Sequence, residues 1–168
     1  MIDKVKCFKG AHMDTIDHKI LNLLYKNARM TWAEMAGLLG LSSPSTAERV
    51  RRLEEKGLIR GYHASLNYEA LGYSILAFIS LSIQSPKHIH GFVHAIAQFR
   101  EVEECYHITG EEDYLLKVRC MNTQHLDEFL THHLKKIPGI VRTKTTIALS
   151  TQKERASSLL IKGKKDGP

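Results

Sequence analysis

Residues 42–61 concentrate basic and hydroxyl side chains in a pattern that suits contact with duplex DNA. Arginine binds guanine or phosphate, and serine and threonine hydroxyls bind bases or phosphates, when a helix enters the major groove. The side chains expected on or near the bases are Ser45, Thr46, Arg49 and Arg52. The full set of expected DNA contacts adds Ser43, with Arg51, Lys56 and His63 nearer the phosphates.

A helix must carry these side chains. Ser43 suits an N-cap, Pro44 suits the first helical position, and Gly57 suits a C-cap. One apolar stripe at helical spacing would seat this helix on a core: Ala47, Val50 and Leu53. Taken alone, the segment fits a solvated charged helix equally well, so the residues that precede it decide between the two interpretations.

The preceding residues predict two more helices. Asp14 with Asp17 begins the first, and the capping-box spacing of Thr31 and Glu34 begins the second, which Gly40 ends. Their apolar residues repeat at helical spacing, and Trp32 and Leu38 are expected in the core. Because only three residues separate Gly40 from Pro44, the sequence predicts a helix-turn-helix over residues 14–65, with residues 58–59 and 62–64 as a wing.

The second half alternates strand and helix patterns. Every second residue is apolar in 75–83, and similar strand-like runs follow at 102–109, 114–120 and 141–149. Helical spacing appears between them at 89–99 and 126–137. The order βαββαβ predicts a ferredoxin-like domain, so the fold class is α+β. Since helices cover one sheet face only, we expect the chain to form at least a dimer.

Composition sets the cellular context. The chain has 168 residues, a net charge of +6 and an odd number of cysteines without a C-x-x-C pair, which favours a reducing, cytoplasmic compartment. No apolar run approaches the ~20 residues that a membrane span needs. The expected segments are a leader (1–13) derived partly from cloning, a helix-turn-helix domain (14–65), a linker (66–73), a ferredoxin-like domain (74–152) and a basic tail (153–168).

Ten histidines raise the question of a metal site. His90 and His94 would share one helix face, but no carboxylate or thiolate stands at ligand spacing, so a solvated face is favoured and no metal or cofactor is expected. The chain also lacks a glycine-rich phosphate loop, a nucleophile elbow and a zincin motif. The nearest acid–base cluster, Glu111–Asp113 with His107, falls in a hairpin, and we do not expect an enzyme.

Six ordered motifs between Asp14 and about Lys153 resemble the Lrp/AsnC (feast/famine) family of transcription regulators. In this chain they read IDHKIL at 16–21, GLS at 40–42, ERVRRLE at 48–54, GLIRGY at 57–62, TGEEDY at 109–114 and IPGI at 137–140. The resemblance implies a winged helix-turn-helix followed by a domain of the RAM type. It also implies dimers that assemble further, commonly into octamers, and a free amino acid bound between dimers.

The family's effector pocket maps, by this resemblance, onto the hairpin turn and the last strand. The residues it implies are His107, Thr109, Gly110, Glu111, Glu112 and Asp113, with Thr146 and Ile147 from a neighbouring subunit. Glycine would let backbone N–H groups reach a carboxylate, and acidic side chains would take the ammonium. Gly110 and Asp113 also fit a simple turn, and that interpretation stays open.

Together with these patterns, the resemblance implies a DNA-binding regulator of amino-acid or nitrogen metabolism genes, modulated by an amino-acid effector. Its expected partners are double-stranded DNA, an amino acid or related small molecule, and further copies of the chain, with no membrane. The alternative is an oligomeric amino-acid sensor, or a metal-responsive ferredoxin-like protein, that does not itself read DNA. Deletion of residues 1–65 would separate them, because only a DNA-binding regulator loses its function.

Overall fold

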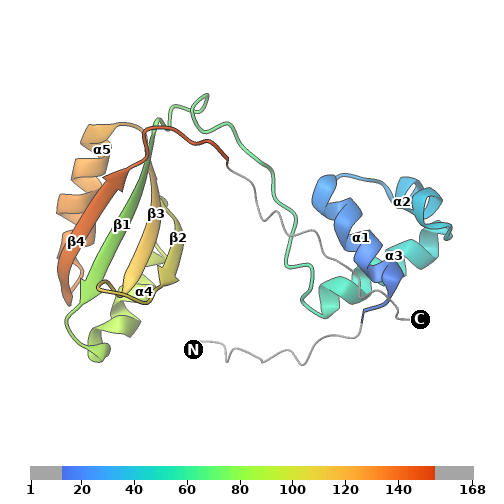
Figure 1. Ribbon diagram of the computed structural model, residues 1–168, viewed down its shortest axis with the longest axis horizontal. Helices are drawn as coiled ribbons and strands as arrows, with labels where there is room; N and C mark the ends of the chain where they lie inside the picture. The colour runs from blue at the N-terminus through green and yellow to red at the C-terminus, as the bar shows by residue number, and fades with distance from the viewer. Residues whose placement is uncertain (1–12, 154–168) are drawn as a thin grey trace. The chain divides into compact units, whose positions relative to one another are not determined.

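The computed structural model describes residues 13–153, which form two compact units that meet in sequence between Ser65 and Leu66. The first unit contains helices and the second contains an antiparallel sheet with its own helices (Figure 1). Apart from Met13 and Lys153, the predicted leader and basic tail lie outside the described residues.

Capping side chains begin the helices of the first unit where the sequence predicts them. This unit contains α1 (Thr15–Lys26), α2 (Trp32–Leu39) and α3 (Ser43–Glu55). Asp14 and Asp17 form a capping box before α1, and Thr31 and Glu34 form one before α2. Each box satisfies backbone N–H groups that have no partner in the first turn of a helix.

The core of the first unit is small and formed by all three helices. Its buried side chains are Ile20, Leu21, Leu24, Met35, Val50 and Leu53. The prediction that Trp32 and Leu38 belong to this core is wrong, because their exposed fractions are 43% and 65%. α2 is only eight residues long, and two of its residues, Met35 and Ala36, are buried in the core.

The start of α3 differs by one residue from the prediction. Ser42, with extended backbone angles, is the N-cap, and its side chain accepts a hydrogen bond from the Ser45 N–H at 3.3 Å. Ser43 is therefore the first helical residue, and Pro44 follows it within the first turn. The other end is as predicted, because Gly57 adopts a left-handed φ of 68° directly after the C-cap.

The predicted wing has no strand pairing in the described residues. Residues 58–66 contain no β-strand. Instead, the phenol of Tyr62 donates a hydrogen bond to Glu54 on α3 at 2.8 Å. Burial and the Glu54 carboxylate raise the pKa of Tyr62 to about 12.

The second unit has the predicted ferredoxin-like topology. Its strands are β1 (Ile75–Ile83), β2 (Val102–His107), β3 (Tyr114–Cys120) and β4 (Ile140–Ile147). They form one antiparallel sheet in the order β2-β3-β1-β4. The strands that follow each helix, β2 and β4, thus lie at opposite edges, and β1 and β3 lie in the centre.

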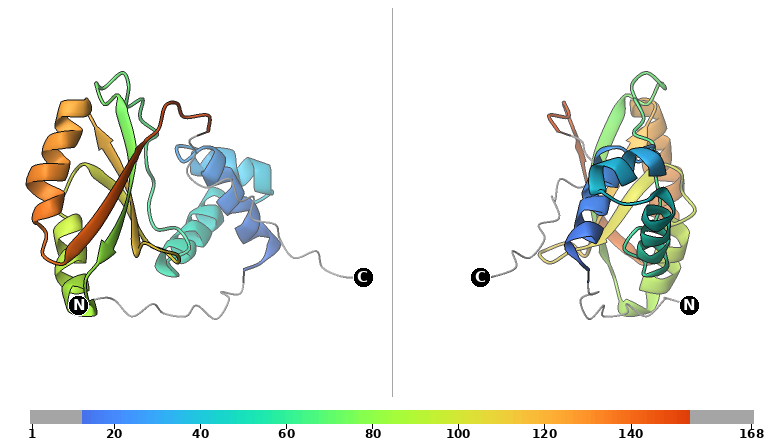
Figure 2. Two further views of the ribbon diagram at one scale, coloured as in Figure 1. Left: turned by 60° about the vertical axis from the view of Figure 1, so that its left-hand side comes forward. Right: turned by 90° about the vertical axis from the view of Figure 1, so that its right-hand side faces the viewer.

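Helices α4 and α5 lie against one face of this sheet (Figures 1 and 2). The 3₁₀ turn η1 (Pro86–His88) leads into α4 (Ile89–Ile96). α5 (Thr123–Glu128) continues without a break through the π turn η2 (Phe129–His133) and the 3₁₀ turn η3 (Leu134–Lys136). The predicted helix at 126–137 is therefore present, but its last turns are not regular α-helix.

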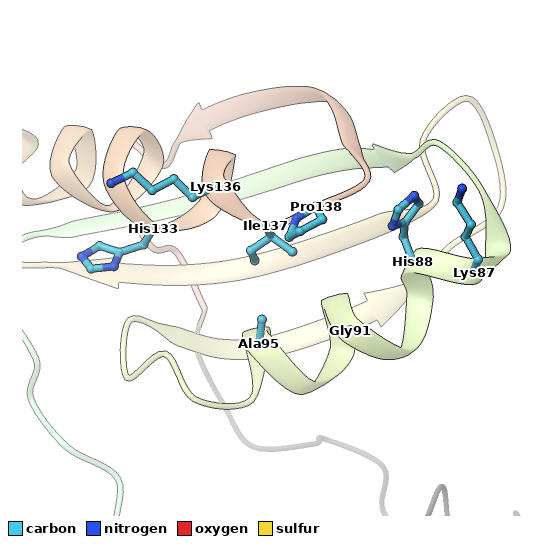
Figure 3. A pocket seen from close by; sticks show the side chains of 8 residues that line it. All are labelled: Lys87, His88, Gly91, Ala95, His133, Lys136, Ile137 and Pro138. Carbon is cyan, nitrogen blue, oxygen red and sulfur yellow. The ribbon is translucent and has the colours of Figure 1, made fainter.

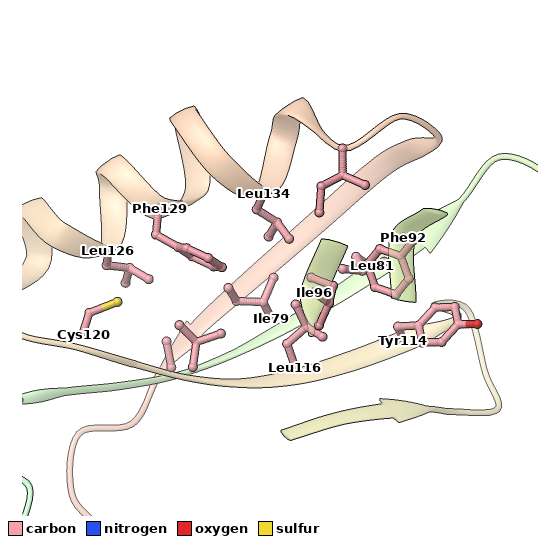
Figure 4. Close-up of a cluster of buried hydrophobic side chains, with 13 residues drawn as sticks. Ile79, Leu81, Phe92, Ile96, Tyr114, Leu116, Cys120, Leu126, Phe129 and Leu134 are labelled. Carbon is pink, nitrogen blue, oxygen red and sulfur yellow. The ribbon is translucent and has the colours of Figure 1, made fainter. Parts of the chain in front are cut away.

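The alternation on β1 explains which face the helices cover. Ala77, Ile79 and Leu81 are fully buried in one core cluster. Ile79 and Leu81 point toward helical residues such as Phe92 and Phe129 (Figure 4). Intervening residues point to the opposite face, where Phe78 is 37% exposed. This second face has no helix over it in the described residues, so the predicted one-sided covering of the sheet is confirmed.

Charged side chains also lie on the uncovered face. Glu103 contacts the Lys117 ammonium at 3.1 Å and the Arg119 guanidinium at 2.6 Å. Burial acts to raise the pKa of Glu103, but Arg119 and Lys117 outweigh it and hold that pKa below its ordinary value. The Arg119 guanidinium lies 4.0 Å from the centre of the Tyr68 ring, which ties the segment before β1 to this face.

Candidate functional site

The outer face of α3 presents most of the predicted DNA contacts to solvent. Ser43, Ser45, Arg51 and Arg52 are exposed, and Lys56 is half-buried at the C-cap. Arg52 and Lys56 also line a small hollow in the first unit together with Asp17. Hydroxyl groups near the N-terminus of a helix and cations along its length suit the phosphates and base edges of a major groove.

Thr46 does not belong to this surface, and the prediction that it contacts bases is wrong. Its side chain is fully buried, and its hydroxyl donates a hydrogen bond to the Ser42 carbonyl at 3.1 Å. Thr46 therefore takes the place in the apolar stripe predicted for Ala47, which is half-buried. A threonine can occupy this buried position because the carbonyl one turn earlier satisfies its hydroxyl.

Arg49 forms ion pairs within the first unit, the helical head of the chain (residues 13–65). Its Nη1 atom lies 2.7 Å from Asp14 Oδ2 and 2.8 Å from Asp17 Oδ1, the two carboxylates that cap α1. Burial acts to raise the pKa of Asp14, but the Asp17 N–H and the Arg49 guanidinium outweigh it and hold that pKa below its ordinary value. The base contact predicted for Arg49 is thus replaced, in this structure, by an anchor between α3 and α1.

Arg51 makes weaker contacts of a different kind. It pairs with Glu48 at 2.7 Å and with Glu55, both on α3 itself, and all three side chains are more than half exposed. Exposed pairs of this type contribute little to stability and are screened by salt. A DNA phosphate can therefore replace the glutamates without disturbing the core. His63 is exposed and lies outside α3.

The second predicted site is the loop 108–113 that joins β2 to β3. Thr109, Gly110 and Glu111 are exposed, and Glu112 is half-buried. Gly110 has a φ of 127°, which favours glycine, and a Cβ atom added there would meet no atom within 4 Å. The loop thus presents open backbone and acidic side chains at one end of the sheet. His107, at the end of β2, is exposed and stacks on Tyr114 with 4.9 Å between ring centres.

Asp113 anchors this loop to the central strand. Its N–H donates to the Leu81 carbonyl at 2.9 Å, and its carboxylate accepts the Ile83 N–H at 2.7 Å. One carboxylate oxygen is therefore already engaged at the end of β1, which limits the predicted role of Asp113 as a partner for an ammonium group. Sequence reasoning missed this contact because Ile83 is separated from Asp113 by 30 residues.

The structure does not bring Thr146 and Ile147 to the same place as the loop. Thr146 pairs with Phe78 and Ile147 with Ala77, whereas the loop contacts β1 near Ile83. At about 3.3 Å per residue, the two regions lie roughly 15 Å apart along β1. Thr146 and Ile147 also point to opposite faces. Within one chain these residues form no common pocket, so a shared site requires a second copy.

The described residues contain neither a cluster that could hold a metal ion nor a helix that could span a membrane. Between residues 13 and 153, no three His, Cys, Asp or Glu side chains converge in a way that could hold a metal ion. None of the helices in the same range combines the length and apolar character that a bilayer crossing requires.

Family models match both units of the chain. Residues 13–60 match a winged helix-turn-helix DNA-binding model, and residues 75–158 match the Lrp/AsnC ligand binding domain. The HTH-type transcriptional regulator FL11 of Pyrococcus abyssi is 36% identical over 142 residues, which cover 84% of this chain and 93% of FL11. The chain belongs to the Lrp/AsnC family.

Further Lrp/AsnC relatives match nearly the whole chain. The leucine-responsive regulatory protein of Escherichia coli is 35% identical over 164 residues, which cover 96% of this chain and 99% of that protein. A Neisseria meningitidis transcriptional regulator solved with L-methionine superimposes with a TM-score of 0.84 at 29% identity, covering 89% of this chain and 98% of that one. Escherichia coli AsnC gives a TM-score of 0.81, also at 29% identity, with 88% and 99% covered.

Membership in the Lrp/AsnC family agrees with the fold of both units. The helices α1 to α3 provide the helix-turn-helix, and the βαββαβ unit provides the ligand binding domain. The chain is thus a DNA-binding transcriptional regulator of this family that carries a ligand binding domain.

Proposed function

We propose that this regulator controls genes of amino-acid or nitrogen metabolism and that an amino acid, bound between the ligand binding domains of different copies, modulates its binding to DNA. Relatives named for leucine, and one solved with L-methionine, support the class of effector. A zwitterion needs donors for its carboxylate and acidic oxygens for its ammonium. The loop 108–113 offers both, at Gly110 and at Glu111 and Glu112.

The observation that carries the proposed mode of DNA reading is the solvent-facing surface of α3. Ser45 and Arg52, seven residues apart, share an exposed surface on a helix whose opposite side is fixed to the core by Val50 and Leu53. Two such helices in a dimer would enter successive major grooves, so the operator should be an inverted repeat with half-sites about one helical turn apart.

Selection of bound duplexes from a random-sequence pool tests this proposal, because the pool offers every possible half-site to the protein. We expect enrichment of an inverted repeat, and affinity for it should fall steeply with salt because bound phosphates release counterions. Deletion of residues 1–65 should abolish enrichment. If the full chain selects no sequence, the protein is not a sequence-specific regulator, and the interpretation as an amino-acid sensor is favoured.

A thermal-shift screen against the standard amino acids tests the effector proposal. Binding to the folded state raises the melting temperature, and the rise grows with the excess of ligand over Kd. The substitutions Glu111→Gln and Glu112→Gln remove charge without touching the Asp113 anchor, so they should reduce the shift for the active amino acid. Asp113→Ala is a poor test, because it also breaks the contact with Ile83. No shift with any amino acid would contradict this part of the proposal.

A further inference from the structure

A cavity of about 350 Å³ lies between α4 and the final turns of the α5 helix (Figure 3). This volume falls within the range of small-molecule sites in proteins. None of the residues that line it belongs to the loop 108–113, to which the amino-acid effector is assigned.

The polar part of the cavity is basic. Lys87 and His88 line it at the start of α4, and His133 and Lys136 line it from the other helix (Figure 3). No carboxylate is among the lining side chains, and the sequence contains no Asp or Glu between residues 85 and 100. This charge distribution favours an anion, since ammonium groups and the N–H groups of histidine rings donate hydrogen bonds to carboxylate and phosphate oxygens.

The remaining wall is apolar. Ala95 on α4 and Ile137 and Pro138 after η3 complete the lining. Such a surface accommodates a short hydrocarbon chain of a ligand. Burial of that chain adds to the affinity that the cations provide. A purely inorganic anion would leave this part of the cavity unused.

Gly91 is the residue that the fold itself does not explain. It lies inside the helix α4, where glycine is less favourable than alanine, and a Cβ atom added there would meet nothing within 4 Å. Gly139, by contrast, has a φ of 92°, and a Cβ atom there would lie only 2.4 Å from His88. Packing therefore requires Gly139 but not Gly91, whose missing side chain keeps the cavity open.

Aromatic packing holds His133 at the cavity. Its ring lies 6.3 Å from that of Phe129, nearly parallel, and 5.7 Å from that of Phe99. His133 ends the π turn η2 (Phe129–His133), which is followed by the 3₁₀ turn η3 that ends at the lining residue Lys136. Single π turns of this kind occur frequently at functional sites.

We propose that this cavity binds a small organic acid with a short apolar chain and no ammonium group, of which an α-keto acid is the simplest class. Lys87 and His88 bind its carboxylate at one end of the cavity, Ile137 and Pro138 contact its chain, and His133 and Lys136 lie at the other end (Figure 3). An amino acid is disfavoured because no lining side chain offers a carboxylate to its ammonium. The regulator thus has two ligand sites of opposite charge preference, one for an amino acid and one for its deaminated counterpart.

Isothermal titration of the full-length protein with α-ketoisocaproate and, as the matched ligand, leucine tests this proposal. We expect saturable binding of the keto acid. Because a charge-assisted hydrogen bond contributes about 1.5–3 kcal/mol, Lys87→Gln should weaken binding by about tenfold or more. Lys136→Gln, at the other end of the cavity, should weaken binding less, and Gly91→Leu should abolish binding by filling the cavity. Lys135→Gln is the matched control, since Lys135 is exposed and does not line the cavity.

Several outcomes would overturn the proposal. These are no saturable heat with the keto acid at millimolar concentration, unchanged affinity in Gly91→Leu, or an equal loss in Lys135→Gln, which would indicate a general charge effect. Competition between leucine and the keto acid would place both at one site. Displacement of the keto acid by inorganic phosphate at equal concentration would show that the apolar wall contributes nothing. Circular dichroism of each variant confirms that the fold is retained.

Discussion

Two arginines on α3, one helical turn apart, have different surroundings. Arg49 is anchored to Asp14 and Asp17, whereas Arg52 is exposed on the outer surface. A guanidinium group that must read a base cannot simultaneously satisfy two capping carboxylates with the same nitrogen. We therefore assign base reading to Arg52 and a positioning role, which fixes α3 on α1, to Arg49.

Arg52→Ala should weaken binding to a selected operator by about 1–3 kcal/mol and relax the base preference at one position of each half-site. Fluorescence anisotropy with the operator and its single-base variants measures both effects. Lys135→Ala removes the same charge from the other unit and serves as the control. Unchanged base preference in Arg52→Ala would contradict the assignment.

Arg49→Ala should lower the free energy of unfolding of the head by about 1 kcal/mol, because it leaves two carboxylates without their cation. Affinity should fall equally for the operator and its single-base variants, since the helix loses its position rather than a base contact. Chemical denaturation and the anisotropy series measure the two effects. Arg51→Ala, which breaks only exposed pairs, should leave the denaturation midpoint unchanged. A changed base preference in Arg49→Ala would restore Arg49 as a reader.

The same anchor predicts a pH dependence. Since the pKa of Asp14 is lower in the folded head than its ordinary value, the stabilisation is complete above that ordinary value, about 3.9, and is lost as the pH falls through the folded pKa. Thermal melts of the wild type and of Arg49→Ala should therefore differ at neutral pH and converge in acid. A difference that persists at the lowest pH would show that Arg49 acts through packing rather than charge.

At the scale of the element, the orientation of α3 depends on how the helix begins. The N-cap is Ser42, and the chain between α2 and α3 includes only the left-handed Gly40, Leu41 and this serine. The turn is short because it contains both the C-cap of α2, Gly40, and the N-cap of α3, Ser42. A cap on the wrong residue would rotate the exposed face of α3.

Ser42→Ala should destabilise the head by about 1 kcal/mol, the usual cost of removing a side-chain cap. Ser43→Ala is the matched control, because Ser43 is the exposed first helical residue and does not cap the helix. Urea denaturation of the two variants compares them directly. The assignment of Ser42 as the cap would be wrong if Ser43→Ala proved the more destabilising substitution.

At the scale of the whole molecule, we propose that the uncovered sheet face binds a second copy of the chain. It exposes Phe78 and Tyr106 and holds the charged cluster around Glu103. An apolar surface bordered by ion pairs is typical of an interface between copies of a chain. The separation of Thr146 from the loop 108–113 points the same way, since only another copy can bring such residues together.

Phe78→Arg should shift the protein from an assembly toward the 19.1 kDa monomer, because it places an unpaired charge in the proposed interface. Light scattering at micromolar concentration measures the change. Val93→Arg is the control, since Val93 is similarly exposed but lies on α4, away from this face. Loss of assembly in Val93→Arg, with assembly retained in Phe78→Arg, would move the interface to the helical side.

The amino-acid sequence by itself determined the local structure of this protein. Capping residues such as Thr31, breakers such as Gly57, and the period-two pattern of β1 fix backbone hydrogen bonds within a few residues, and they predict the helix-turn-helix and the βαββαβ order. The exposed acidic turn with Gly110 was also predictable, because turn chemistry is local.

Only the tertiary structure decided which side chains remain free to act. Arg49 and Asp14 are 35 residues apart, and Asp113 and Ile83 are 30 apart. Whether such groups meet depends on how packed helices and strands bring distant segments together, which periodicity does not encode. For the same reason, no pattern marked the cavity beside Gly91, since its two walls come from helices joined through two strands of the sheet.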